Sequence, residues 1–357
     1  MPGRLRTCRP TPPSGRCAAT SDPRQITFPV HPWRVNRQSP GASRFRTMSS
    51  ETVNVDNFAR AETHRMFAAL QTRGATNELV HVRAPESLDE QPVIRQNRDT
   101  LYSSAIVDIS RGAALTLPDS RGRYMSVMVV NEDHYINRIL HEPGTHELSV
   151  ADYDTDYVLI VVRTLADPND PADIAAVNAL QDEIQLKATS DRAFVAADFD
   201  KASLDSTRSA LLDLARGLPR YDRAFGRKED VDPVRHLLGT AAGWGGLPEQ
   251  EAFYLNVEPG LPIGNYELRI GEVPVDAFWS ISVYNAAGYF EQVGDAEVSL
   301  NSVTAQRDND GSITVRFGTA AGPNTLGVMD GWNYIVRLYR PHPVVLDGTW
   351  TFPSLGK

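Results

Sequence analysis

The sequence predicts a mainly β fold with a helical insert, in which a small helical segment joins two β domains. Short apolar stretches, separated by Gly, Pro, Asp and Asn, fill residues 79–164 and 253–352. Between them, apolar residues recur at helical spacing. A length of 357 residues allows two or three domains, and a hydrophobic content of 41% is ordinary for a globular protein.

The two β regions also share a pattern. Met125–Asn131 is followed four residues later by Tyr135, and Trp279–Asn285 is followed four residues later by Tyr289. This similarity predicts an internal repeat, in which a core strand ends at a loop that begins with Asn. Any alternating strand followed by an Asn turn gives the same pattern, so both interpretations stay open. Each half then reaches a Tyr-x5-Arg strand, at Tyr157 to Arg163 and at Tyr334 to Arg340.

The first 47 residues differ in composition from the rest of the chain. They hold nine Arg, no Lys, eight Pro, both cysteines and one acid, which gives a charge of +8 against a total of −9. We expect residues 1–47 to be a disordered or misassigned extension, with Met48 as the true start. The remaining acidic body argues against nucleic acid and anionic membranes as partners. Because no cysteine follows Met48, we expect a cytoplasmic protein without disulfides or thiolate metal sites.

The predicted elements divide the rest of the chain into four parts. Residues 48–75 form an N-terminal helix, predicted over 54–73, and 76–165 a first β domain. Residues 166–248 form a helical linker with three helices, two of which begin at Asp-Pro pairs, and 249–357 form a second β domain. The uninterrupted apolar run Val158–Val162 predicts a strand buried on both faces. The predicted strands are Thr100–Ile109, Ala113–Leu117, Tyr124–Val130, Tyr157–Thr164, Phe253–Val257, Tyr266–Ile270, Phe278–Tyr284, Ser312–Phe317, Trp332–Tyr339 and Thr349–Phe352.

The Asp-Gly pair at residues 310–311 predicts a hairpin turn. Asp310-Gly311 lies between Val303–Arg307 and Ile313–Phe317, which predicts a hairpin. The acidic run before Gly311 resembles a calcium loop, but it lacks the alternating ligands and the closing Glu of one.

Two groups of motifs resemble known families. Asn97–Ser103, followed by Gly122–Tyr124, resembles the bacterial domain-of-unknown-function family 1254. A second group of motifs resembles the bacterial domain-of-unknown-function family 1214: Tyr254–Asn256, Pro274–Ser280, Tyr284-Asn285 and Gly331–Tyr334. Together the resemblances cover nearly all of residues 50–355. They imply two β-sandwich-like domains, one Ig-like and one jelly-roll-like, with helices between them, and a homo-oligomer. Members of these families are sometimes labelled carboxylesterase-like, but the resemblance implies no settled activity.

The first β domain offers candidate residues on a strand and in a loop. On the strand, Arg98 and Tyr102 share a face that can hold a carboxylate, because Arg presents a planar fork of donors. In the loop after Asn131, the acids Glu132 and Asp133 adjoin His134, and a carboxylate beside an imidazole makes it a better general base. The alternatives are a strand fixed by an internal ion pair and a solvated turn capped by Asn131.

The second β domain and the linker offer binding residues. Trp279 and Tyr284 flank a loop at Asn285 and Tyr289, where amide and aromatic groups can line a pocket. Arg337 lies in an otherwise apolar strand, so it needs either a structural acid or a ligand anion as partner. The last two candidates are Arg235 and His236, which precede the Gly-rich link between the domains.

The search for other chemistry is mostly negative. Nucleophile motifs such as Gly-x-Ser-x-Gly, the phosphate-binding Gly loop and the dinucleotide fingerprint are absent, so we predict no cofactor. His134, His141, Glu142 and His146 lie close in sequence, but their spacing does not favour a metal site, and we predict none. We therefore expect an enzyme, hydrolase-like or a lyase, in which His134 acts on a small carboxylate-bearing, ester or amide molecule between the domains. The alternatives are a non-catalytic module that binds a small molecule or glycan, and a structural homo-oligomer.

Overall fold

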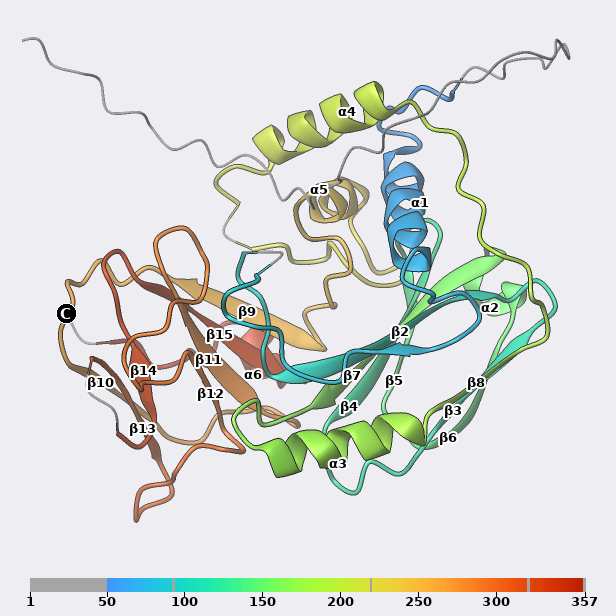
Figure 1. Cartoon of the computed structure of the whole chain (residues 1–357). Coiled ribbons are helices and arrows are strands. Elements are labelled where there is room, and N and C mark those ends of the chain that lie inside the picture. The colour runs from blue at the N-terminus through green and yellow to red at the C-terminus, as the bar shows by residue number, and fades with distance from the viewer. Residues whose placement is uncertain (1–49, 92–93, 219, 320–321, 356–357) are drawn as a thin grey trace, which may run out of the picture. The chain divides into compact units, whose positions relative to one another are not determined.

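The computed structural model describes residues 50–91, 94–218, 220–319 and 322–355. Within these ranges the chain forms fifteen strands in four sheets and six helices (Figure 1). The fold is therefore mainly β with helices between two β regions, which confirms the predicted class. Residues 1–47, for which we predict a disordered or misassigned extension, lie outside the described residues.

Two sheets build the first β region. The larger has the order β1-β2-β7-β4-β5, and the smaller has the order β6-β3-β8. Their facing side chains form one hydrophobic core, to which β2, β3, β4, β6 and β7 all contribute, so the two sheets make a sandwich. The strands are β1 Val80–His81, β2 Thr100–Asp108, β3 Ala113–Leu117, β4 Met125–Asn131, β5 Ile136–Leu140, β6 Gly144–Leu148, β7 Tyr157–Leu165 and β8 Gln185–Ala188.

Strand β7 is the middle strand of the larger sheet and is covered on both faces. Val158, Ile160 and Val162 point into the sandwich core. Leu159 and Val161 point to the opposite face, where they pack with side chains of α1 and of the second β region. The prediction of a strand buried on both faces is confirmed.

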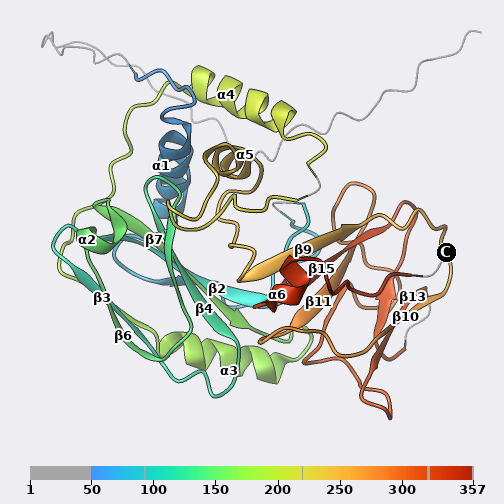
Figure 2. The same cartoon turned by 180° about the vertical axis from the view of Figure 1, so that it is seen from behind.

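Two of the three helices between the sandwiches begin at the predicted Asp-Pro pairs, and the third, whose start was not predicted, also begins at an aspartate. Asp170, Asp200 and Asp232 each accept a hydrogen bond from a backbone N–H of the first turn. Helices α1, α4 and α5 gather around a shared apolar cluster, and Figures 1 and 2 show them together from both sides. The helix predicted over 54–73 is shorter, because it begins only after a turn at Asn57. The helices are α1 Phe58–Gln71, α2 Val150–Tyr153, α3 Pro171–Asp182, α4 Lys201–Leu214, α5 Pro233–Gly243 and α6 Pro343–Leu346.

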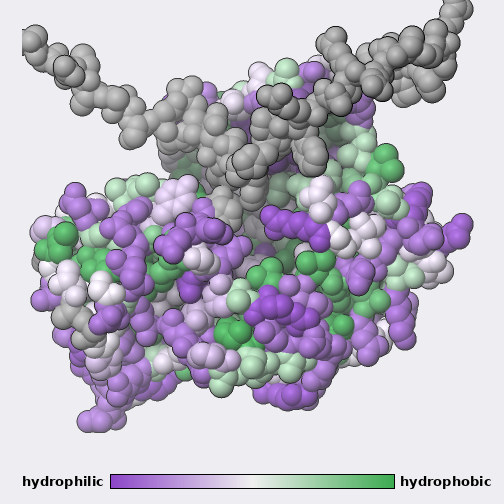
Figure 3. Space-filling view, in the orientation of Figure 1, coloured by the Kyte–Doolittle hydropathy of each residue, from purple (hydrophilic) through white to green (hydrophobic). Residues whose placement is uncertain are grey.

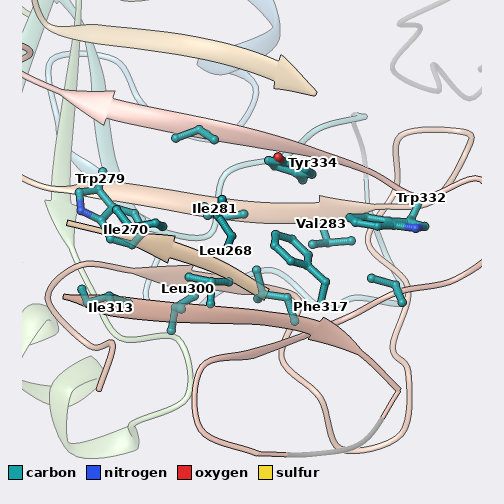
Figure 4. Close-up of a cluster of buried hydrophobic side chains, with 14 of the residues drawn as sticks. Leu268, Ile270, Trp279, Ile281, Val283, Leu300, Ile313, Phe317, Trp332 and Tyr334 are labelled. Atoms are coloured by element: carbon teal, nitrogen blue, oxygen red, sulfur yellow. The ribbon is translucent and has the colours of Figure 1, made fainter. Parts of the chain in front are cut away.

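The second β region is also a sandwich. A four-stranded sheet, in the order β12-β11-β15-β9, faces a three-stranded sheet, in the order β10-β13-β14. Figure 4 shows the core between them, with Trp279 and Ile281 of β11 against Ile270 and Phe317 of the facing sheet. The strands are β9 Ala252–Val257, β10 Tyr266–Ile270, β11 Trp279–Tyr284, β12 Ser299–Asn301, β13 Ile313–Gly318, β14 Thr325–Gly327 and β15 Asn333–Tyr339.

Two strand predictions are wrong. Val303–Arg307 is a turn and loop, so Asp310-Gly311 closes a local turn without a hairpin, and β13 pairs with β10 and β14 instead. Thr349–Phe352 is irregular and follows the short helix α6. For Val303–Arg307 the reason is that β10 and β14 occupy both sides of β13. In the other direction, the polar strands β5, β6 and β8 are observed but not predicted.

The surface is mostly hydrophilic on the face shown in Figure 3, where apolar residues form scattered patches. None of the six helices in the described ranges is long and apolar enough to cross a membrane.

Candidate functional site

His134 lies in the loop after β4, but it is fully buried. Its Nδ1–H donates to Thr240 Oγ1 at 2.7 Å, because the hydroxyl hydrogen of Thr240 is already donated to the carbonyl of His236. Its Nε2 accepts the N–H of Gly245 at 2.8 Å. Burial holds the pKa of His134 well below its ordinary value, so the ring is neutral. With both nitrogens bonded to protein, neither is free for a substrate proton.

The two acids beside His134 point to other partners. Glu132 is 8% exposed and accepts hydrogen bonds from His64 Nε2 at 2.9 Å and from the N–H of Tyr157 at 3.1 Å. Asp133 forms a bidentate pair with Arg60 of α1 at 2.6 Å. The acids therefore fix α1 to the sheet rather than orient His134. Glu132 and Arg60 also line a small cavity of about 340 Å³.

The linker candidates are structural as well. His236 is 3% exposed and lies 3.1 Å from the carbonyl oxygens of both Ala224 and Asp133. Its ring stacks on Tyr135 at a centroid distance of 4.6 Å. The Arg235 guanidinium donates to the carbonyl of Arg220. Neither residue lines one of the two cavities described in this section.

The Asn97–Ser103 motif meets the second sandwich in a buried polar network. Asp99 is 2% exposed, and its carboxylate accepts hydrogen bonds from Ser280 at 2.6 Å and Tyr339 at 3.1 Å. Burial raises the pKa of Asp99. Asn97 donates to the hydroxyls of Tyr102 and Tyr339. This network ties β2 to the outer face of the sheet that contains β11 and β15. Arg98, in contrast, donates to the carbonyl of Glu86 and stays outside the network.

The hydrogen-bond partners of Arg337 are hydroxyl and carbonyl groups, rather than the structural acid or ligand anion that the sequence predicts. Its guanidinium donates to Ser282 at 2.9 Å, to Tyr284 Oη at 2.8 Å and to the carbonyls of Arg95 and Gln96. Asp99 acts on it only through its charge, since no carboxylate of the described residues lies within salt-bridge distance. Tyr284 is fully buried and donates to the carbonyl of Gln96. Arg337 and Tyr284 thus hold the segment before β2 on the second sandwich.

The prediction that Trp279 and Tyr289 line an aromatic pocket is wrong. Trp279 is 4% exposed and lies inside the second sandwich core, so it cannot line a ligand site (Figure 4). Asn285 accepts the N–H groups of Ala287 and Tyr289 and caps its turn. Tyr289 is 37% exposed, and no described cavity includes it.

The larger described cavity, of about 600 Å³, lies between the two sandwiches. Its walls combine Tyr124 and Leu165 of the first sandwich with Phe278 and Arg340 of the second. Tyr124 packs edge-on against Phe278 at 5.3 Å. Burial raises the pKa of Tyr124 to about 12, so its phenol is protonated. A volume of this size fits a small organic ligand, and the walls combine apolar side chains with charged ones such as Arg340 and Asp276.

A histidine and a carboxylate from different sandwiches meet at this cavity. His141, just after β5, places Nε2 at 2.8 Å from Glu251 Oε2, just before β9. Its Nδ1 lies 3.2 Å from the carbonyl of Met125. The side chains are 19% and 22% exposed, so solvent reaches the pair. A histidine oriented by a carboxylate is the arrangement that general acid–base catalysis needs.

A metal site is not formed by the four residues that lie close in sequence. His146 Nε2 bonds to the carbonyl of Glu142, His141 bonds to Glu251, and His134 is sealed inside the protein. Across the ranges that the structure describes, no group of three or more His, Cys, Asp or Glu could hold a metal ion.

The comparisons with known proteins follow the order of the two motifs. Residues 76–137 match the family model "Protein of unknown function (DUF1254)", and residues 261–343 match "Protein of unknown function (DUF1214)". The chain joins a DUF1254 region to a DUF1214 region. This confirms the resemblance and its order.

The chain is also similar to solved structures. The VPA0106 protein from Vibrio parahaemolyticus is 16% identical, with a TM-score of 0.67, over 84% of this chain and 96% of that one. An uncharacterised protein from Burkholderia cenocepacia is 14% identical, with a TM-score of 0.46, over 85% and 88%. No curated protein matches the chain. At these identities the first likeness shows the fold alone.

Sequence reasoning missed His141 and Glu251 as a pair. His141 follows the DUF1254 match and Glu251 precedes the DUF1214 match, and 110 residues separate them. The Tyr-x5-Arg pattern gives no signal for this pair, but it ends at two other residues of the junction. Its two arginines, Arg163 and Arg340, lie at the face between the sandwiches and at the cavity.

Proposed function

We propose that this protein is an enzyme that acts on a small carboxylate-bearing ester or amide in the cavity between its sandwiches. One observation carries the proposal: His141 of the first sandwich is oriented by Glu251 of the second, at a cavity of about 600 Å³. The pair exists only when both sandwiches are in place. His141 takes the role that the sequence predicts for His134, because His141 lines the cavity and is partly exposed whereas His134 is fully buried.

In this proposal His141 transfers the proton. Glu251 holds Nε2 and stabilises the imidazolium that forms when the ring accepts a proton. The longer contact, between Nδ1 and the Met125 carbonyl, is the one that a substrate or water oxygen can replace. Nδ1 then removes a proton from the attacking water and returns it to the leaving group.

Arg340 would anchor the substrate carboxylate. Its only ion pair among the described residues is a long one, 3.7 Å to Asp276, and its side chain makes no hydrogen bond there. The neighbouring Arg123 is less available, because it is bound in a bidentate pair with Asp173. An arginine with unused donors at the rim of a cavity suits a carboxylate. Tyr124 and Phe278 would hold the apolar part of the substrate.

The experiment compares two esters with the full chain, p-nitrophenyl hemisuccinate and p-nitrophenyl acetate. We expect His141→Gln to lower kcat by about 10²- to 10⁴-fold, the usual contribution of general acid–base catalysis. We expect Arg340→Gln to raise KM for the hemisuccinate only, by about tenfold. Matched controls are His146→Gln and the surface variant Arg316→Gln, neither of which lines the cavity.

Two results would contradict the proposal. One is turnover that survives in His141→Gln at the wild-type rate. The other is a wild-type protein that neither cleaves the esters nor gains thermal stability from succinate or benzoate. Native mass spectrometry of the same samples checks the predicted homo-oligomer, which stays a prediction.

A further inference from the structure

Arg163 occupies the centre of the larger sheet of the first sandwich. Strand β7 lies between β2 and β4, and Arg163 is opposite Tyr102 on one side and Ser126 on the other. Its side chain leaves the sandwich core and points to the face that packs against the second sandwich. A charged side chain at this position must find compensation, because arginine stays protonated in proteins.

The described residues leave this charge largely uncompensated. Arg163 is 8% exposed, and its Nη1 has no hydrogen-bond partner among them. Its Nη2 makes one long contact, 3.4 Å to the carbonyl of Gly245. The guanidinium carbon lies 5.5 Å from the centre of the Tyr102 ring, and no described carboxylate lies within 4 Å. Arg337, the other buried arginine, donates from both Nη1 and Nη2.

The groups around Arg163 are hydroxyls, and solvent can reach them. Tyr102, Tyr124 and Tyr254 all interact with its charge. Tyr254 of β9 is 40% exposed, and Tyr102 and Val161 on the sheet face are half-buried. A buried guanidinium with unused donors and neighbouring phenol groups provides the donor set that oxyanions require.

We propose that Arg163, with the hydroxyls of Tyr102 and Tyr254, binds a small oxyanion such as a carboxylate or phosphate between the sandwiches. Arg163 itself does not line the cavity that contains His141, but Tyr124, which interacts with Arg163, does, so this site adjoins the proposed active site. It would place a second anionic ligand, or an activating anion, at the junction that assembles the His141–Glu251 pair.

The test measures thermal stabilisation of the full chain by acetate and by inorganic phosphate in a low-salt, anion-poor buffer. We expect a saturable rise in Tm for the wild type and a Kd that rises about tenfold or more in Arg163→Gln. Tyr254→Phe keeps the fold and removes one hydroxyl, so it should weaken binding by a few-fold. If Arg163→Gln does not fold, Arg163→Lys and Tyr254→Phe carry the test.

The controls separate this site from the proposed active site. His141→Gln and Arg316→Gln should keep the wild-type response to the anion. A response to acetate alone identifies a carboxylate ligand, and a stronger response to phosphate identifies a phosphate. No response in the wild type, or an equal response in Arg163→Gln and Tyr254→Phe, would overturn the assignment. If the wild type cleaves neither ester but its Tm still rises with acetate or phosphate in the way that depends on Arg163, the result counts against the proposed function alone.

Discussion

The two loops that begin with Asn have the same backbone hydrogen bonds in different surroundings. In the first, Asn131 N–H donates to the Tyr135 carbonyl and its side chain accepts from two backbone N–H groups. Asn285 does the same with Tyr289 in the second loop. The fourth residue of each loop has a positive φ, 65° at His134 and 87° at Gly288. The turn is therefore a local property of its asparagine.

The difference between the loops is the fourth residue. Glycine adopts a positive φ without strain, whereas for a histidine this backbone costs on the order of 1 kcal/mol. His134 is kept there by its bonds to Thr240 and Gly245, which come from α5 and the Gly-rich link. The first loop thus serves as an attachment point for the helical segment. The second loop has no such ring, and the carbonyl of its Gly288 accepts the N–H of Arg95 instead.

Removing the His134 ring should have the largest effect. His134→Ala leaves the Gly245 N–H without its acceptor, removes the donor to Thr240 Oγ1 and creates a cavity beside Trp244. We expect a loss of about 3–5 kcal/mol in the free energy of unfolding. Urea unfolding of the full chain measures it, with His146→Ala as the control, for which we expect less than about 0.5 kcal/mol. A loss under about 1 kcal/mol would show that the ring does not attach the helices.

Replacing the two asparagines should cost different amounts of stability, although their turns have the same hydrogen bonds. Asn131 is 1% exposed and also donates to the Tyr153 carbonyl, whereas Asn285 donates to the carboxylate of Glu291 in a solvent-facing loop. We expect Asn131→Ala to cost about 2–3 kcal/mol and Asn285→Ala about 1 kcal/mol. The same urea experiment measures both. Equal losses would mean that the turn alone, rather than its surroundings, sets the cost.

The smallest effect concerns pH. Because burial lowers the pKa of His134 in the folded state, the unfolded chain binds the proton more readily. The stability that this histidine contributes is complete at a pH above about 6.5, the ordinary pKa of histidine in an unfolded chain. It is lost progressively as the pH falls below that value. We expect His134→Asn to reduce the slope of stability against pH by up to about 1.4 kcal/mol per unit below pH 6.5. An unchanged slope in unfolding curves from about pH 5 to 8 would contradict the buried, neutral ring.

Much of the fold could be predicted from local patterns. Strands such as β3 and β10 match their predicted bounds, because their apolar residues and the Gly and Pro at their ends are local properties. Helices α3 and α5 begin at the predicted caps, since Asp170 and Asp232 satisfy the first N–H groups themselves. Strand β8 was missed, because its Gln and Lys become strand residues only by pairing with β3.

The candidate site was less predictable. The sequence predicts a catalytic role for His134, but a histidine in an acidic loop looks the same in sequence whether it faces a substrate or a helix. His141 and Glu251 gave no signal, because a pair between distant residues has no spacing. Trp279 looked like a ligand-binding aromatic, but only the packing of the two sheets shows which face of β11 is core.

The sequence by itself determined the class of fold, the helix starts, the two asparagine turns and the order of the two family regions. Each depends on residues within a few positions of one another, where backbone geometry and hydrogen bonding are set locally. Tertiary structure alone decided that His134 is sealed, that His141 meets Glu251 at a cavity and that Arg163 has no acid partner within the described ranges. These depend on which buried groups of distant segments meet, because the cost of burying a charge or a polar atom is fixed by its neighbours in space.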